Sequence, residues 1–209
     1  MRARITFTKQ GALRYTGHLD LHRLWERAMR RAELPLAYSQ GFHPQPKISI
    51  AAALPLGFSS RGEVLDVRFN EEISTQEVAD RLKNSLPKDI QITQVESVEE
   101  RLPALQTLIL SAEYEVHLTE PVEGSDLKRK IEEIKNSETL PRERRSKFYD
   151  LRPLIERLEM ETDVNGKHCL FMTLTAREGA TGRPEEVLNA LGIEPEYTRV
   201  ERMKLIFKE

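Results

Sequence analysis

The order of the predicted secondary-structure elements constrains the fold of this chain more than any other feature of its sequence. Residues 3–9 alternate between apolar and polar side chains, which predicts a half-buried strand. Residues 18–33 carry apolar side chains at three- and four-residue spacing, which predicts a helix that ends at Leu34 and Pro35. The remaining patterns of the first half predict strands at 47–54, 62–69 and 90–98 and a helix at 74–85. This β-α-β-β-α-β order is the ferredoxin-like plan, a four-stranded antiparallel sheet with two helices on one face.

The strand at 62–69 has a regular alternation of its own. Leu65, Val67 and Phe69 lie on one side of it, whereas Val64, Asp66 and Arg68 lie on the other. We therefore expect the first set to be buried and the second set to face away from the core.

The second half of the chain repeats this order less regularly. Its patterns predict a strand at 108–118, a helix at 125–135, an extended segment at 146–151, strands at 154–162 and 168–175, a helix at 184–191 and a strand at 199–207. We predict an α+β fold of two tandem ferredoxin-like domains, residues 1–102 and 107–209, with a linker at 99–106. The second domain is the less regular one because it has an extra strand between its helices.

The distribution of charge separates the two halves. The 209 residues carry a net charge of −2, but residues 1–60 hold nine lysines and arginines against three acidic residues, which gives +6. Residues 61–209 hold 23 basic and 31 acidic residues, which gives −8. The basic end is therefore the candidate surface for a polyanion.

The cysteine and histidine content argues against metal chemistry on this chain. A single cysteine, Cys169, forms no internal disulfide and holds no iron-sulfur cluster, and its place in a predicted strand indicates a core residue. His18 and His22 are four residues apart and His43 follows in a loop, but the HExxH pattern is absent. We therefore expect no metal and no cofactor, and any radical chemistry must come from a partner protein.

The longest strongly apolar stretch, residues 48–57, is far shorter than the roughly 20 residues that cross a bilayer. The first residues also lack the apolar core of a signal peptide. We therefore expect a cytoplasmic protein with no membrane contact.

The first predicted helix carries the clearest binding signal. Arg23, Arg27, Arg30 and Arg31 form a cationic stripe beside its apolar face, so the helix can pack on the sheet and still display guanidinium groups. Guanidinium groups bind phosphate through two parallel hydrogen bonds, and exposed aromatic rings can stack bases. The alternatives are an ordinary solvated helix face, another anion or a protein partner. The predicted nucleic-acid-binding residues are Arg4, Arg14, Tyr15, His18, Arg23, Arg27, Arg30, Arg31, Phe42, His43 and Lys47, and structural roles are assigned to Asp20, Gly41 and Gly57.

A second basic run, at residues 142–147, is interrupted by acidic residues, and we interpret it as a solvated loop. The sequence places no Ser-His-Asp or Cys-His triad, so no catalytic residue is assigned.

Several short motifs together resemble the radical-SAM-linked bacterial proteins, a family in which this domain stands alone or is fused to a radical S-adenosylmethionine protein. They include Gly17-His-Leu-Asp20, Leu54-Pro-Leu-Gly57 and Tyr149-Asp-Leu-Arg-Pro153, with Ser39-x-Gly-Phe42 and Pro46-Lys47 between them. The resemblance implies a radical SAM partner and an RNA setting. This chain has Gly17 where the family commonly has serine, so a role for a hydroxyl group at that position is not carried over.

Three functions are compatible with these features. The first is an accessory protein, not an enzyme by itself, that binds RNA and presents it to a separate radical SAM enzyme in RNA modification or ribosome-related metabolism. The second is a metal-independent endoribonuclease, which rests on analogy between folds, with His18, His22 or His43 as acid or base. The third is a protein-interaction module that binds no nucleic acid.

Overall fold

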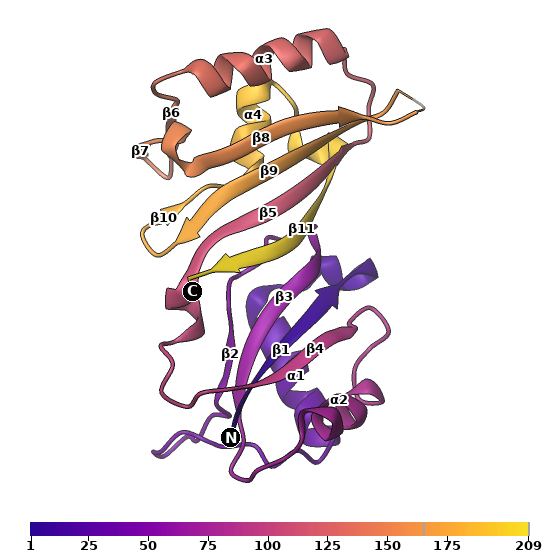
Figure 1. Cartoon of the computed structure of the whole chain (residues 1–209), viewed down its shortest axis with the longest axis vertical. Helices are drawn as coiled ribbons and strands as arrows, with labels where there is room; N and C mark the ends of the chain where they lie inside the picture. The colour runs from indigo at the N-terminus through magenta and orange to yellow at the C-terminus, as the bar shows by residue number, and fades with distance from the viewer. Residues whose placement is uncertain (165, 209) are drawn as a thin grey trace. The chain divides into compact units, whose positions relative to one another are not determined.

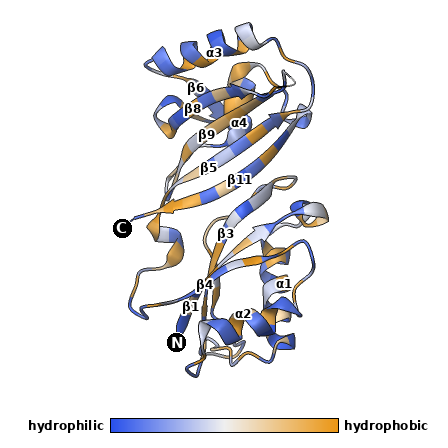
Figure 2. Cartoon of the chain, turned by 45° about the vertical axis from the view of Figure 1, so that its right-hand side comes forward, coloured by the Kyte–Doolittle hydropathy of each residue, from blue (hydrophilic) through white to orange (hydrophobic). Residues whose placement is uncertain are grey.

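The computed structural model describes residues 1–164 and 166–208, and the chain divides into two compact units, Met1–Leu108 and Ile109–Glu209. Both units combine helices with antiparallel strands, so the fold is α+β (Figure 1). Hydrophilic and hydrophobic residues alternate along the helices, as expected for helices that cover a sheet (Figure 2). None of the helices in the described ranges has the length and apolar character that a membrane span requires.

The first unit contains each helix and strand that its sequence patterns predict. Its sheet has the strand order β2-β3-β1-β4, with all neighbours antiparallel, and Ile5 lies opposite both Leu65 of β3 and Val95 of β4. The predicted strand at 47–54 is shorter than expected, because the chain turns after Ile50 and reaches Pro55, which has no backbone donor. In chain order the elements are β1 (Arg2–Lys9), a 3₁₀ helix (Gly11–Tyr15), α1 (His18–Arg31), β2 (Ile48–Ile50), β3 (Ser59–Arg68), α2 (Thr75–Lys83) and β4 (Ile92–Val98).

The core of the first unit lies between the sheet and its two helices. Alternate residues of β1, which include Ile5 and Phe7, are fully buried and pack against apolar residues of α1 and α2. Trp25 of α1 meets Phe7 edge-on, with 4.7 Å between the ring centroids. This packing fixes which side of α1 faces the protein and which side faces solvent.

The face of β3 opposite to its core-facing residues Leu65 and Val67 is buried as well. Val64 and Asp66 are buried, with 6% and 4% of their surface exposed. Asp66 lies under the side chains of Arg2 and Arg4 from β1, whose guanidinium groups donate hydrogen bonds to its carboxylate. An internal ion cluster therefore covers this face of the strand.

The second unit has the strand order β8-β9-β5-β11, again antiparallel, and the two-residue β10 also pairs with β9. Apolar residues of α3 and α4 are buried together with Ala112, Tyr114 and Val116 of β5, whereas Glu115 and His117 lie on the opposite face of the sheet. In chain order the elements are β5 (Ile109–Leu118), α3 (Gly124–Asn136), β6 (Pro141–Arg144), β7 (Lys147–Asp150), β8 (Ile155–Thr162), β9 (His168–Arg177), β10 (Ala180–Thr181), α4 (Pro184–Leu191) and β11 (Thr198–Phe207).

The extended segment predicted at 146–151 is one arm of a hairpin. β6 and β7 pair antiparallel, with Arg144 opposite Lys147, and the two residues between them, Arg145 and Ser146, have φ angles of 50° and 61°. Two consecutive positive φ angles are typical of the tight turns that join adjacent strands.

Candidate nucleic-acid interface

Helix α1 carries its arginines opposite its buried residues. Leu21, Trp25, Ala28 and Met29 face the core at three- and four-residue spacing. Arg23, Arg27 and Arg31 recur every four residues and are exposed, which aligns them along one edge of the solvent side. Since four residues of α-helix rise about 6 Å, the three arginine positions span about 12 Å of the helix axis.

These three arginines line an open groove of about 530 Å³ in the first unit, which we call the α1 groove. The opposite wall comes from Ser85–Pro87, the segment that follows α2. The full lining is Thr16, Asp20, Arg23, Leu24, Arg27, Ala28, Arg31, Ser85, Leu86 and Pro87. With three arginines and one aspartate, the charged groups of the α1 groove sum to +2.

The guanidinium groups of the α1 groove have few internal partners. The contact from Arg23 to the Asp20 carboxylate is long, at 3.5 Å, and both side chains are about two-thirds exposed. Arg31 reaches the carbonyl oxygen of Ser85 at 3.4 Å. Within residues 1–164 and 166–208, no hydrogen bond or ion pair reaches Arg27. The groove therefore offers donors to an external anion, for which phosphate is a good geometric match.

Arg30 does not belong to this set, although the sequence analysis grouped it with the other three. Its guanidinium forms an ion pair with Glu26 at 2.8 Å and lies 5.8 Å from the centroid of the Tyr38 ring. Glu26 is one helical turn before Arg30 and attracts it away from the α1 groove.

Arg4 is also separated from the cationic helix face, which corrects its predicted position. Because β1 alternates, Arg4 projects from the face of the sheet opposite to Phe7, the residue that packs against α1. Its guanidinium donates to both carboxylate oxygens of Asp66, at 2.9 and 3.2 Å, and 15% of its side chain is exposed. Arg4 therefore serves the internal ion cluster.

Arg14 and Tyr15 lie together just before α1. The Arg14 guanidinium lies 4.7 Å from the centroid of the Tyr15 ring, and 64% of Tyr15 is exposed. The Gly57 amide donates to the carbonyl oxygen of Arg14, and a Cβ atom at Gly57 would lie 4.0 Å from the Tyr15 ring. Gly57 has a φ of +87°, a backbone conformation that favours glycine in this turn.

The loop between α1 and β2 displays the other predicted contact residues. Phe42 is fully exposed at its tip, and His43 and Lys47 are exposed beside it. Gly41 adopts a φ of +125° there, which again fits a structural glycine. The base of the loop is closed by backbone pairing between Tyr38 and Pro46.

The histidines near α1 have different surroundings. His18 is the exposed first residue of the helix, and Nε2 of His22 lies 3.2 Å from the carbonyl oxygen of Ile48. Among the described residues, the groups of three potential ligands that lie close together do not include His18, His22 or His43.

The β6–β7 hairpin forms a second cationic surface, which the sequence analysis interpreted as a solvated loop. Arg144, Arg145, Lys147 and Arg183 line a groove of about 640 Å³ in the second unit. Phe148 is 81% exposed in this groove, and burial near Glu186 raises the pKa of the neighbouring Tyr149. Asp150 holds the base of the hairpin, because its Oδ1 accepts hydrogen bonds from the amides of Leu140 and Arg152, at 2.7 and 2.9 Å.

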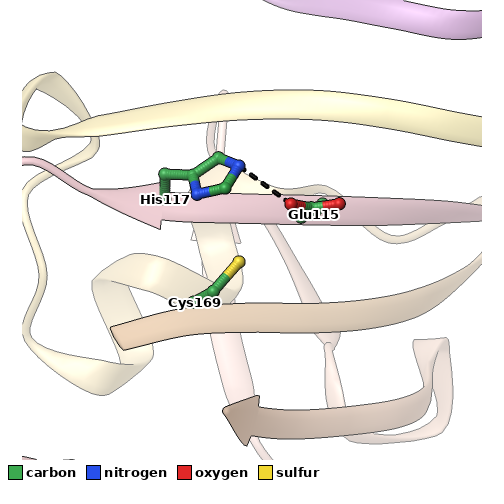
Figure 3. Close-up of side chains that lie close together, drawn as sticks. All are labelled: Glu115, His117 and Cys169. Atoms are coloured by element: carbon green, nitrogen blue, oxygen red, sulfur yellow. Dashed lines mark ion pairs between the residues drawn. The ribbon is translucent and has the colours of Figure 1, made fainter. Parts of the chain in front are cut away.

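A third cluster, which the sequence analysis missed, lies on the sheet of the second unit (Figure 3). Glu115 and His117 extend from the same face of β5, and Cys169 of β9 lies directly opposite His117. Nε2 of His117 is 2.9 Å from the Glu115 carboxylate, and the ligand atoms of all three side chains lie within 4.8 Å of one another. Burial, with the negative charge of Glu115, raises the pKa of the Cys169 thiol to about 11.

The strand alternation at Glu115 and His117 was the available sequence signal for this cluster. That alternation alone does not identify the third member, because Cys169 is 52 positions after His117 and only the β5–β9 register sets the two opposite each other. The interpretation of Cys169 as a core residue is wrong in part, since its side chain is half-buried and lines a groove.

A comparison with known protein families identifies the family of this chain. Residues 2–184 match a family described as uncharacterized proteins conserved in bacteria, DUF2344. The chain belongs to this bacterial family. The match covers all of the first unit after Met1 and most of the second. No curated protein matches the chain.

Two solved structures align with this DUF2344 protein. A chain from a crystal structure of a Cbf5–Nop10–Gar1 complex aligns with a TM-score of 0.51 and 12% identity over 99% of this chain. The alignment covers 50% of that chain, so this protein spans half the length of its structural relative. A crystal structure of a putative glycine cleavage system transcriptional repressor aligns with a TM-score of 0.26 and 9% identity, over 99% of this chain and 98% of that chain.

Proposed function

We propose that this protein binds RNA through the α1 groove and presents it to a separate radical SAM enzyme. The observation that carries the proposal is the alignment of Arg23, Arg27 and Arg31 along one groove, with Arg27 unpaired among the described residues. Three guanidinium groups at regular spacing suit a linear polyanion better than a single small anion.

Exposed aromatic side chains support RNA as the polyanion. Tyr15 and Phe42 are 64% and 102% exposed, and sequence-tolerant binding of single strands combines a cationic track with aromatic stacking. Both residues belong to the unit that contains the α1 groove.

The partnership with a radical SAM enzyme rests on the resemblance of motifs and on the cysteine content. One cysteine holds no iron-sulfur cluster, so the radical chemistry belongs to another chain. Leu19 and Leu56 of the first unit are 71% and 64% exposed, and we propose them as contacts with that partner.

We also propose that both units are ferredoxin-like domains, the second with the β6–β7 hairpin as an insertion. The support is the matching strand order, β2-β3-β1-β4 in one unit and β8-β9-β5-β11 in the other.

The direct test of the RNA proposal is a comparison of groove variants by fluorescence anisotropy with a labelled single-stranded RNA at low salt. Replacing Arg27 and Arg31 with alanine should weaken binding roughly tenfold or more, because two charge-assisted contacts are lost. Arg30→Ala is the matched control, since Arg30 lies on the same helix outside the α1 groove, and it should bind as the parent does. Equal affinity of the parent and the double variant would contradict the proposal.

Experiments with the same purified protein distinguish the two alternative functions. Cleavage of the labelled RNA in the presence of a chelator would favour the endoribonuclease. Failure of the parent to bind RNA, with retained binding to a radical SAM protein, would favour the interaction module.

The proposed contacts through Leu19 and Leu56 have their own test. A variant with the uncharged replacements Leu19→Ser and Leu56→Ser should keep RNA affinity and lose association with a radical SAM protein from the same cells in size-exclusion chromatography. Unchanged association would contradict this part of the proposal.

A further inference from the structure

We propose that Glu115, His117 and Cys169 bind a zinc ion on the sheet of the second unit. This inference is independent of the proposed RNA function, because it rests on different residues in the other unit. No metal site was predicted from the sequence, because the chain has a single cysteine and the histidines around α1 lack a metal-binding pattern. The strand register supplies the missing ligands.

The backbone brings the three side chains together. Glu115 and His117 are two residues apart on β5, so both point to the same face, and the antiparallel register sets Cys169 opposite His117. Figure 3 shows the three side chains gathered on that face of the two neighbouring strands. Because each ligand comes from a paired strand of one sheet, their separation is set by the hydrogen-bonded ladder, not by a loop.

The distances are close to those of a bound ion. The three ligand atoms lie within 4.8 Å of one another. Zinc–ligand bonds of about 2.0–2.3 Å in a tetrahedron separate the ligand atoms by about 3.5 Å. Side-chain rotations that close the largest gap by roughly 1 Å and widen the 2.9 Å contact between His117 and Glu115 by roughly 0.5 Å are therefore sufficient. Binding would release the proton of the Cys169 thiol and the proton shared between His117 and Glu115.

The donor set selects the metal. One thiolate, one imidazole and one carboxylate suit a borderline ion such as zinc, whereas magnesium and calcium prefer oxygen ligands only. A zinc ion with three protein ligands keeps its fourth position for water or another small ligand.

The surroundings provide room for that fourth ligand. The cluster lines a groove of about 870 Å³ in the second unit, and Lys167 and Arg199 line the same groove. Glu120 and Asp163 line it as well, so the charges of the groove do not favour one sign for that ligand. His168 is held separately, with Nδ1 2.9 Å from the Thr162 hydroxyl, so it stands outside the set of three ligands.

The test is cobalt and zinc binding to the full chain. Cobalt bound by a thiolate gives a sulfur-to-cobalt charge-transfer band in the near ultraviolet, and the chain has one cysteine, so this band reports on Cys169 alone. We expect the parent to develop the band with one equivalent of cobalt and to lose it when one equivalent of zinc is added. Absence of the band in excess cobalt would overturn the proposal.

Variants decide whether the other two side chains are ligands. His117→Ala and Glu115→Gln should each weaken zinc binding at least tenfold, while melting of the metal-free chain stays near that of the parent. Matched controls are His43→Ala, an exposed histidine in the other unit, and Glu120→Gln, an acidic residue of the same groove. A band and a zinc affinity that survive both ligand variants would mean that Cys169 binds metal without this site, and would also overturn the proposal.

Discussion

Replacing Asp66 with alanine should destabilise the first unit by about 3–5 kcal/mol, the usual cost of removing one partner from a buried ion pair. Only 5% of the Asp66 and Arg2 side chains is exposed. The carboxylate accepts hydrogen bonds from Arg2 at 2.6 and 3.0 Å and from Arg4 at 2.9 and 3.2 Å. Arg2 keeps two further acceptors, the carbonyl oxygens of Leu102 and Pro103, but its charge would lose its counter-ion.

The assay is urea denaturation followed by tryptophan fluorescence. Trp25 is the single tryptophan of the chain and is fully buried against Phe7, so its emission reports on the first unit. With a urea dependence of about 2 kcal/mol per molar, the transition midpoint should fall by roughly 1.5–2.5 M.

A second variant separates lost pairing from lost volume. Replacing Arg2 with methionine together with Asp66→Leu removes the two most buried charges of the cluster as a pair. This double variant should be more stable than Asp66→Ala, because paired replacement by apolar side chains is often neutral. A cost below about 1 kcal/mol for Asp66→Ala, the range of exposed ion pairs, would refute the reasoning.

Two further predictions concern the second unit. At pH 8 the Cys169 thiol should react with iodoacetamide roughly 100-fold more slowly than a cysteine of ordinary pKa, because its pKa of about 11 leaves little thiolate. Glu115→Gln should speed this alkylation by removing a negative charge near the thiol. A parent rate equal to that of an exposed cysteine would contradict both the burial of Cys169 and the effect of the Glu115 charge on it. Asp150→Ala should cost about 1–3 kcal/mol and speed tryptic cleavage after Arg144 or Arg145, because two backbone amides lose their acceptor. Unchanged cleavage would show that the hairpin does not depend on Asp150.

The alternation and the helical spacing were sufficient to predict most elements of both units. The pattern of Leu21, Trp25 and Ala28 fixes the buried side of α1 locally, so the positions of Arg23 and Arg27 follow from helix geometry alone. What this periodicity did not show is the local pairing of Arg30 with Glu26. The four-residue spacing between Glu26 and Arg30 was visible in the sequence, but the contact between Arg30 and the Tyr38 ring was not.

Contacts between distant strands explain the other differences. Asp66 is buried because β1 places Arg2 and Arg4 over it, and the alternation of β3 alone gives no sign of this. The cluster of Glu115, His117 and Cys169 likewise depends on the β5–β9 register. The β6–β7 turn was hidden for another reason, since Arg145 and Ser146 adopt positive φ angles without the asparagine or glycine that marks such turns.

The salt dependence of RNA binding tests the central claim most directly, because it counts phosphate contacts. Three contacts, from Arg23, Arg27 and Arg31, give a slope of about −2 for log affinity against log salt with a single strand. The parent and Arg30→Ala should therefore lose roughly 20-fold in affinity between about 50 and 200 mM salt. The Arg27→Ala, Arg31→Ala variant should have a slope near −0.7 and lose about threefold. A double variant with the slope of the parent, or a parent that binds no RNA at low salt, would contradict the assignment of the α1 groove as the RNA-binding surface.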